Sequence, residues 1–468
     1  MRLTRLPLSL VIAAGLMLSG CVTAPTKPDP GVTIPGAWNT ASPPGQAVTA
    51  DWWRRFGSPE LDGVVQRALT GSNDLAAAVA RVHQATAQAR IAGAALWPEL
   101  DAGATANRQT GGAGDVTDEN GNSFTAGLTA TYEIDFWGKN RAVRQAAQAE
   151  LSASAYDRDT VRLTVVAGAA SLWLQTVALR ERAGIAAQDL DLARQTLALV
   201  EAQARAGAAS PLDVAQQRGL VANQQRTLAS LRQASQDSEA TLAVWLGGTT
   251  GRLDVSATSL DPVTVPGIDA GVPTALLARR PDIAQAEAQL AAADANVTAA
   301  RAAMLPSLTL SAGAGYASDT VHTLFDTPLY TIAAGLTAPI FEGGQLRGAR
   351  DLAVAQREEL LADYHAAIVA AFGDVDKALN AVAGLDTQIR AQDTALAEAQ
   401  RAYTLAQSRY RAGAETLLTV LTTQQALFAA QDEAIQLKQA RLQAAVALYQ
   451  ALGGGWQAPS APDHDRDS

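Results

Sequence analysis

The sequence predicts a protein of mixed α and membrane β class. A duplicated unit would give each chain four transmembrane β-strands and long antiparallel helices. The duplication rests on recurring segments, because Arg205-Ala-Gly returns as Arg411-Ala-Gly, and Leu246-Gly-Gly returns as Leu452-Gly-Gly, both at an offset of 206. Two long stretches contain no proline, which would cost about 3 kcal/mol inside a helix. Between the helical stretches, apolar and polar residues alternate as in strands with one apolar face.

The N-terminus has the pattern of a bacterial lipoprotein signal. Residues 1–20 join two arginines to an apolar run, which is typical of a secretory signal peptide and is shorter than the about 20 residues that span a bilayer. The segment ending at Cys21 resembles a lipobox, so Cys21, the only cysteine, is the expected attachment site of a diacylglycerol and an N-acyl chain. Val22 favours the outer membrane in the lipoproteins that this segment resembles. A plain cleavage site with a free thiol is the alternative, and residues 21–59 are expected to form a tether and a collar segment.

Long helices are expected in both copies. Alanine, leucine, glutamine and arginine dominate these stretches, with apolar residues at helical spacing. At a rise of 1.5 Å per residue, the longest helix of each copy would span about 100 Å, and two shorter helices stacked end to end would match it. The expected helices are 74–96, 139–205 and 211–246 in the first copy, residues 60–260, and 281–304, 343–411 and 417–452 in the second copy, residues 261–456.

Each copy also predicts two strands between its first short helix and its long helix. Their lengths suit a transmembrane barrel, whose strands need about 9–11 residues. Trp97 and Trp137 flank the first hairpin, where an aromatic girdle would lie, and residues 109–123 have the composition of an exposed loop. A soluble sheet with one face on a helix layer is the alternative. The expected strands are 99–107 and 124–135, followed by 307–317 and 329–340.

Four strands cannot form a membrane pore on their own. An open sheet edge in lipid leaves backbone N–H and C=O groups without partners, and single-chain barrels start at about 8 strands. Several chains would therefore have to share one barrel, with the helices continuing it as a tube.

Composition and motifs indicate neither catalysis nor nucleic-acid binding. The net charge is −10 at pH 7, which argues against nucleic acid as a partner. The four histidines are scattered, no metal-ligand spacing occurs, and no nucleophile elbow or phosphate loop is found. We therefore expect no enzyme activity and no cofactor or metal, apart from the lipid on Cys21. The tail, residues 457–468, is expected to be disordered.

Four segments carry a resemblance to a known family: Trp52–Asp62, Leu276–Ile283, Ala300–Leu308 and Tyr449–Trp456. They resemble the outer-membrane efflux protein family, the TolC-like channels, and in particular its NodT/OprM-type lipoprotein branch, over nearly all of residues 21–456. The resemblance implies a homotrimer whose twelve-stranded β-barrel continues into a periplasmic α-helical barrel.

The function implied by this resemblance is that of an outer-membrane exit duct in a tripartite efflux pump. Its partners would be outer-membrane lipid, a periplasmic adaptor protein and an inner-membrane RND transporter, and its cargo drugs or other small amphipathic compounds. A duct for type I protein secretion or metal export is the alternative, and a lipid-anchored coiled-coil scaffold without a pore is an alternative of another class.

The same resemblance implies where the duct closes and where the adaptor docks. Aligning the two Arg-Ala-Gly turns places the closing ring at Leu418 and Thr422. Many relatives carry an aspartate at the second position, so Thr422 leaves Leu418 as the better gate candidate. Asp213 and Gln216 are the nearest polar residues of the first copy. Packing of Leu418 in a helix seam is the alternative. The expected docking residues lie at the turns, where helix-turn chemistry alone could also explain them: Gly207, Ser210, Leu212, Gly413, Thr416 and Leu417.

Overall fold

The computed structural model describes residues 30–41, 45–109, 121–249 and 255–458. The chain divides into two units, Met1–Gly31 and Val32–Ser468, and the fold below is that of the second. The expected signal peptide, the lipid site at Cys21, most of the 109–123 loop and nearly all of the tail lie outside the described residues.

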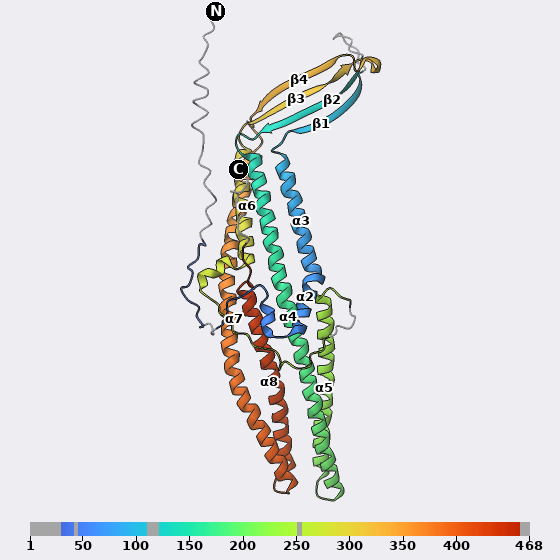
Figure 1. Ribbon diagram of the computed structural model, residues 1–468, viewed down its shortest axis with the longest axis vertical. Helices are drawn as coiled ribbons and strands as arrows, with labels where there is room; N and C mark the ends of the chain where they lie inside the picture. The colour runs from blue at the N-terminus through green and yellow to red at the C-terminus, as the bar shows by residue number, and fades with distance from the viewer. Residues whose placement is uncertain (1–29, 42–44, 110–120, 250–254, 459–468) are drawn as a thin grey trace, which may run out of the picture. The chain divides into compact units, whose positions relative to one another are not determined.

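The helices of the two copies correspond in length one by one (Figure 1). The first short helices both have 22 residues, the long helices both have 67, and the return helices both have 35. These equal lengths agree with the duplication inferred from the recurring segments. The helices are α3 (Asn73–Ala94), α4 (Lys139–Arg205), α5 (Pro211–Trp245), α6 (Pro281–Ala302), α7 (Gln345–Arg411) and α8 (Leu417–Ala451).

Within each copy, the two shorter helices pack along the long one. α3 and α5 both contact α4, and α6 and α8 both contact α7. α6 and α8 also contact α4, so α4 joins the two copies. An 18-residue window of α4 is apolar enough for a membrane span by composition alone, but 56% of that window is buried inside the protein. The apolar residues of α4, such as Val166 and Leu174, belong to the core of the fold.

The strands form one antiparallel sheet in the order β1-β2-β3-β4. The register places Leu100, Ala130, Ala312 and Ile332 in one row across the sheet, so the apolar residues share a face, as the alternation predicted. Within the described chain, one edge of β1 and one edge of β4 have no partner strand. The strands are β1 (Glu99–Gln109), β2 (Gly121–Ile134), β3 (Ser307–Ser318) and β4 (Pro328–Thr337).

The ends of the strands show where β4 stops and where two exposed tryptophans lie. β4 ends at Thr337, short of the expected residue 340, because Pro339 has no N–H to donate to a ladder. Trp97 and Trp137 are 75% and 47% exposed, and the Trp137 indole donates to the carbonyl oxygen of Pro306 at 2.8 Å. Exposed indoles beside the strand ends suit a membrane–water interface.

The described part of the expected tether and collar segment, residues 30–41 and 45–59, packs on the rest of the fold. The Trp38 indole donates to the carbonyl of Gly271 at 2.8 Å, and Gln46 pairs with Ile268 in a parallel bridge. Burial of large apolar side chains explains this docking, because the 3-10 helix η2 (Trp52–Phe56) places three aromatic rings in the core. The helix α2 (Pro59–Gly71) follows, and η3 (Pro273–Ala278) and η4 (Val321–Thr323) are further short elements that the sequence reading missed.

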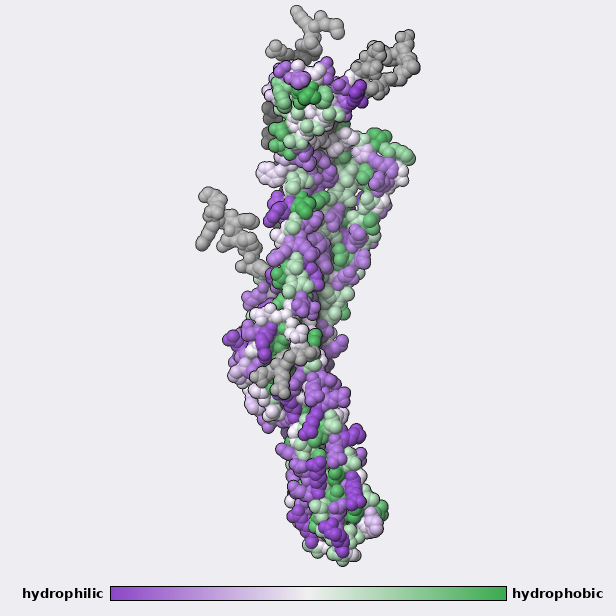
Figure 2. All heavy atoms as spheres, turned by 90° about the vertical axis from the view of Figure 1, so that its right-hand side faces the viewer, coloured by the Kyte–Doolittle hydropathy of each residue, from purple (hydrophilic) through white to green (hydrophobic). Residues whose placement is uncertain are grey.

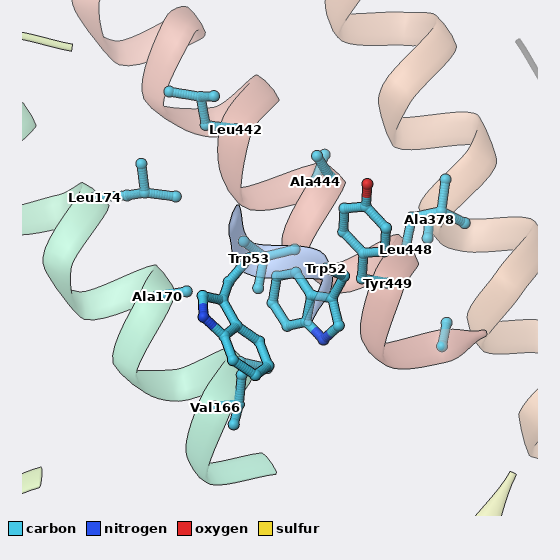
Figure 3. Packing of buried hydrophobic residues seen from close by; sticks show 14 of the residues in the cluster. Trp52, Trp53, Val166, Ala170, Leu174, Ala378, Leu442, Ala444, Leu448 and Tyr449 are labelled. Carbon is cyan, nitrogen blue, oxygen red and sulfur yellow. The ribbon is translucent and has the colours of Figure 1, made fainter. Parts of the chain in front are cut away.

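The main core surrounds this aromatic segment (Figure 3). Trp52 stacks on Tyr449 of α8 with ring centroids 4.8 Å apart and contacts Phe56 edge-on. Trp173 of α4 is fully buried in the same cluster. The cluster therefore connects the start of the described chain, the middle of α4 and the end of α8.

The recurring Leu-Gly-Gly motif ends the two return helices against this core. Gly247 and Gly453 both have positive φ, 76° and 83°, which favours glycine. A Cβ at Gly247 would lie 1.9 Å from the carbonyl oxygen of Gly71, and one at Gly453 would lie 1.9 Å from that of Arg279. Both positions require glycine for two reasons, backbone conformation and close approach of another backbone.

Glu60 of α2 connects the core to residues 256 and 257, near the end of the first copy. One carboxylate oxygen accepts the Trp173 indole N–H at 3.0 Å, and the other accepts the backbone N–H groups of Ser256 and Ala257 at 3.0 and 3.1 Å. Burial alone would raise the pKa of Glu60, but these hydrogen bonds, with that of the Ser256 hydroxyl, lower it overall. The charged form is therefore favoured by folding.

We expect Glu60→Gln to lower the free energy of unfolding by about 1 kcal/mol at pH 7, because charge-assisted hydrogen bonds to a partly solvated group are lost. Since folding lowers the pKa of Glu60, its contribution is present above the ordinary value of 4.5 and is lost as pH falls below it. Denaturant titrations at pH 7 and pH 3.5 check this: the difference between wild type and variant should shrink at the lower pH. A difference that stays constant with pH would contradict the role of the charge.

Candidate functional site

The candidate site consists of the two turns that join each long helix to its return helix. In the first, Gly207 has φ 74° and the Ala208 N–H donates to the Gln203 carbonyl at 2.8 Å. In the second, Gly413 has φ 72° and the Ala414 N–H donates to the Arg409 carbonyl at 2.9 Å. The recurring Arg-Ala-Gly segment therefore ends both long helices in the same way, with a glycine in the left-handed backbone conformation.

The return helices begin with different caps. In α5, the Ser210 hydroxyl accepts the N–H of Asp213 at 3.3 Å, and the Asp213 carboxylate accepts the N–H of Ser210 at 2.8 Å, which is a capping box. In α8, the Thr416 hydroxyl accepts the N–H of Thr419 at 3.3 Å. The carboxylate of Glu415 accepts from the Thr416 N–H, and this bond lowers its pKa. Asp213 was expected as a polar group at the mouth of the duct. Its carboxylate instead caps the N-terminus of its own helix, α5.

Leu418 points away from the helix seam. Its side chain is 63% exposed in the chain, and Leu212, the equivalent residue of the first copy, is 65% exposed. Within one chain, Leu418 therefore does not pack in the helix seam; its neighbour Leu417 fills the seam and is only 5% exposed. Leu417 was expected among the docking residues, and docking there stays a prediction in which its backbone, and not its buried side chain, would be available.

The remaining expected residues lie on the open surface of the turns. Gly207, Ser210, Gly413 and Thr416 are exposed, as are Gln216 and Thr422. The Thr422 hydroxyl donates to the carbonyl of Leu418 at 2.9 Å, within its own helix. The structure brings Thr422 one turn from Leu418, and Gln216 stands in the equivalent place in the first copy, one turn from Leu212.

The sequence reading missed the contacts that hold the two turns side by side. The hydroxyl of Tyr410, on α7, donates to the side-chain oxygen of Gln203, on α4. Tyr403, one heptad earlier, is buried, and burial raises the pKa of its phenol. A second cluster of buried apolar residues surrounds these groups; it contains Leu190, Val200, Leu220, Leu231, Val420 and Leu427 among others.

The surface here suits exposure to water. On the face seen in Figure 2, hydrophilic residues dominate the lower helices and hydrophobic residues form narrow stripes between them. Within the described residues, no group of three or more His, Cys, Asp or Glu side chains could hold a metal ion. The site is therefore a set of helix turns, caps and exposed leucines.

Comparison with known proteins identifies the class. The model of the family described as outer membrane efflux protein matches residues 64–248 and again residues 272–454. This chain belongs to the outer membrane efflux protein family, and the two matches coincide with the two copies. Its fold class is confirmed, and it is an outer-membrane protein of the efflux-channel class.

Individual relatives cover nearly the whole chain. The pyoverdine export outer membrane protein OpmQ of Pseudomonas aeruginosa is 50% identical over 458 residues, 96% of this chain and 96% of that protein. The cation efflux system protein CusC of Escherichia coli O157:H7 is 30% identical over 460 residues, 96% of this chain and 98% of that one. The structure of the outer-membrane channel OprN has a TM-score of 0.87 and 25% identity, covering 93% of this chain and 99% of the other.

Proposed function

We propose that three copies of this chain form the outer-membrane exit duct of a tripartite efflux pump. The observation that carries this proposal is the sheet, which has an apolar face, a polar face and two edges that no described strand pairs with. Such a sheet is stable in lipid only when the edges close, and joining β4 of one chain to β1 of the next gives a barrel without edges. The chain, lipid-anchored through Cys21, would act with a periplasmic adaptor and an inner-membrane transporter, which we expect to be of the RND type.

The first cargo to test is a small secreted molecule of the pyoverdine type. The support is the similarity to the pyoverdine exporter, 50% over 96% of the chain. The proteins named for solvent efflux are less similar, at 33% identity, so drugs and other amphipathic compounds come second. Export of metal ions is a further candidate, since two relatives at 30% identity are named for cation efflux, and type I protein secretion stays the other alternative.

The cargo can be tested in a host that lacks its own pyoverdine outer-membrane exporter. Expression of this chain should restore pyoverdine in the medium and remove it from the periplasm. A variant that lacks residues 307–337, and with them β3 and β4, is the matched negative control. Restored resistance to drugs without restored pyoverdine secretion would replace the first cargo with the second.

We propose further that the turns form the periplasmic end of the duct. Leu418, exposed near the start of α8, would supply an apolar constriction, with Thr422 behind it and Leu212 and Gln216 in the first copy. Exposed backbone and side chains at Gly207, Ser210, Gly413 and Thr416 would be available to the adaptor. The bond between Tyr410 and Gln203 would then keep the two turns of one chain together in the closed state.

Tyr410→Phe is expected to raise the leak conductance of the purified protein in planar bilayers by severalfold, because it removes one cross-copy hydrogen bond, worth about 1 kcal/mol, without changing the packing of the ring. Tyr316→Phe, far from the turns on an exposed position of β3, is the control and should leave the leak unchanged. An unchanged leak in Tyr410→Phe would show that this bond does not restrain the tip.

A further inference from the structure

A charged cluster lies where the two copies meet between the aromatic core and the turns. We call it the inter-copy seam: Arg182 of α4 with Asp432 and Gln436 of α8, together with Asp189, which lies about two helical turns further along α4. The Arg182 guanidinium binds the Asp432 carboxylate through two bonds, of 2.6 and 3.0 Å. The Gln436 amide donates to the same carboxylate at 2.7 Å. The Arg182–Asp432 pair therefore joins the two copies through residues 250 positions apart in the sequence.

Asp189 is the exceptional member of the seam. Its side chain lies among the buried residues, with 7% relative exposure, and within the described chain no hydrogen bond or ion pair compensates its charge. Arg182 is already engaged by Asp432. Burial, together with the charge of Asp432, raises the pKa of Asp189 to about 7. A buried carboxyl without a partner is costly when ionised.

No cation on the neighbouring helices takes the place of a partner. α5 runs opposite this part of α4, between the contacts Gln217–Ala193 and Arg180–Glu239. Its remaining charged side chains there are exposed or paired: Arg218 binds Glu201, whereas Arg226, Arg232 and Asp237 are exposed. On α7, which packs against α8, Arg390 is exposed and donates a hydrogen bond to Thr387. Glu433, beside Asp432 on α8, is exposed, so Asp432 is the charge that acts on Asp189 from another element.

We propose that Asp189 is a proton-sensitive latch between the two copies, closed when the carboxyl is neutral and weakened when it is ionised beside Asp432. The ionised fraction of a group with a pKa of about 7 rises from about a tenth at pH 6 to about nine-tenths at pH 8. Because folding raises this pKa, the stabilising contribution is present at low pH and is lost as pH rises through 7. The seam then loosens, and α7 with α8 moves more easily relative to α4 with α5. The inference rests on the proposed duct, since it assigns the loosened seam to opening of the tip.

Hydrogen exchange tests the latch separately from conduction. Protection factors, which are corrected for the intrinsic effect of pH on exchange, should fall severalfold between pH 6 and pH 8 in peptides that cover residues 183–195 and 426–438. Asp189→Asn should abolish this fall and keep the low-pH protection at both values. Asp191→Asn is the matched control, because Asp191 is two residues away, 69% exposed, and bound only to Arg194 at 3.5 Å; it should behave as wild type.

Planar-bilayer recording provides the second measurement. Wild-type open probability should rise severalfold from pH 6 to pH 8, and Asp189→Asn should remain at the low level. Protection factors that do not change with pH in the wild type, or that change equally in Asp189→Asn, would overturn the latch. If the protein conducted at no pH while the protection factors still responded, the proposed duct would fail and the latch between the copies would stand.

Discussion

Gly453→Ala is expected to lower the free energy of unfolding by about 2–5 kcal/mol. The left-handed backbone, φ 83°, costs an L-residue about 1–2 kcal/mol. The added Cβ would lie 1.9 Å from the Arg279 carbonyl oxygen and 2.8 Å from its carbon, and displacing a packed backbone adds about 1–3 kcal/mol. Thermal unfolding followed by circular dichroism would show a clearly lower midpoint for the variant.

A matched glycine separates the two causes. Gly207 also has positive φ, 74°, but a Cβ there would meet no atom within 4 Å. Gly207→Ala should therefore show the conformational cost alone, about 1–2 kcal/mol. Equal losses in the two variants would mean that the contact with Arg279 is unimportant, and a Gly453→Ala protein as stable as wild type would contradict the role assigned to the Leu-Gly-Gly motif.

Leu418→Asp is expected to increase leak conductance severalfold, and by more than Leu212→Asp. Three carboxylates would replace three leucines at the proposed constriction, where they would admit water and repel one another. The two leucines have nearly the same exposure in the chain, 63% and 65%, so local structure does not separate them. The expected difference in leak conductance rests on the resemblance to the efflux-channel family, which implies that the second copy closes the duct.

Single-channel recordings of both variants, reconstituted under identical conditions, decide this point. Leu418→Ile keeps an apolar side chain of the same size and serves as the control, with a leak near that of wild type. If Leu212→Asp and Leu418→Asp raised the leak equally, a gate borne by the second copy would be excluded, and the six turns of the assembly would be equivalent.

The regular elements could be predicted from the sequence because their signals are local. The helix expected over 139–205 is observed as Lys139–Arg205, since the proline-free run is bounded by Gly138 before it and by the Arg-Ala-Gly turn after it. The strands followed from strict alternation. The small helix α2 was missed although its signals are local: Ser58 and Pro59 form a good N-terminus, and its buried residues recur at helical spacing.

Long-range contacts could not be predicted in the same way. Trp38 donates a hydrogen bond to Gly271, and Trp52 stacks on Tyr449. Because these partners are far away in the sequence, no local pattern predicts that the N-terminal segment packs on the core. At the tip, the choice of which leucine is buried, Leu417 or Leu418, depends on how α8 rotates against α4 and α7. The contact between Tyr410 and Gln203 depends on the same packing of one copy against the other.

The proposed function requires several copies of this chain to close into one conducting duct. Single-channel recording of the purified protein in planar bilayers, combined with its mass in the same detergent, tests it most directly. We expect an assembly of three chains that gives discrete conductance steps, with larger steps or longer openings in Leu418→Ala. A protein that has the mass of one chain and shows no conductance, even with Leu418→Ala, would contradict the account and leave the lipid-anchored coiled-coil scaffold in its place.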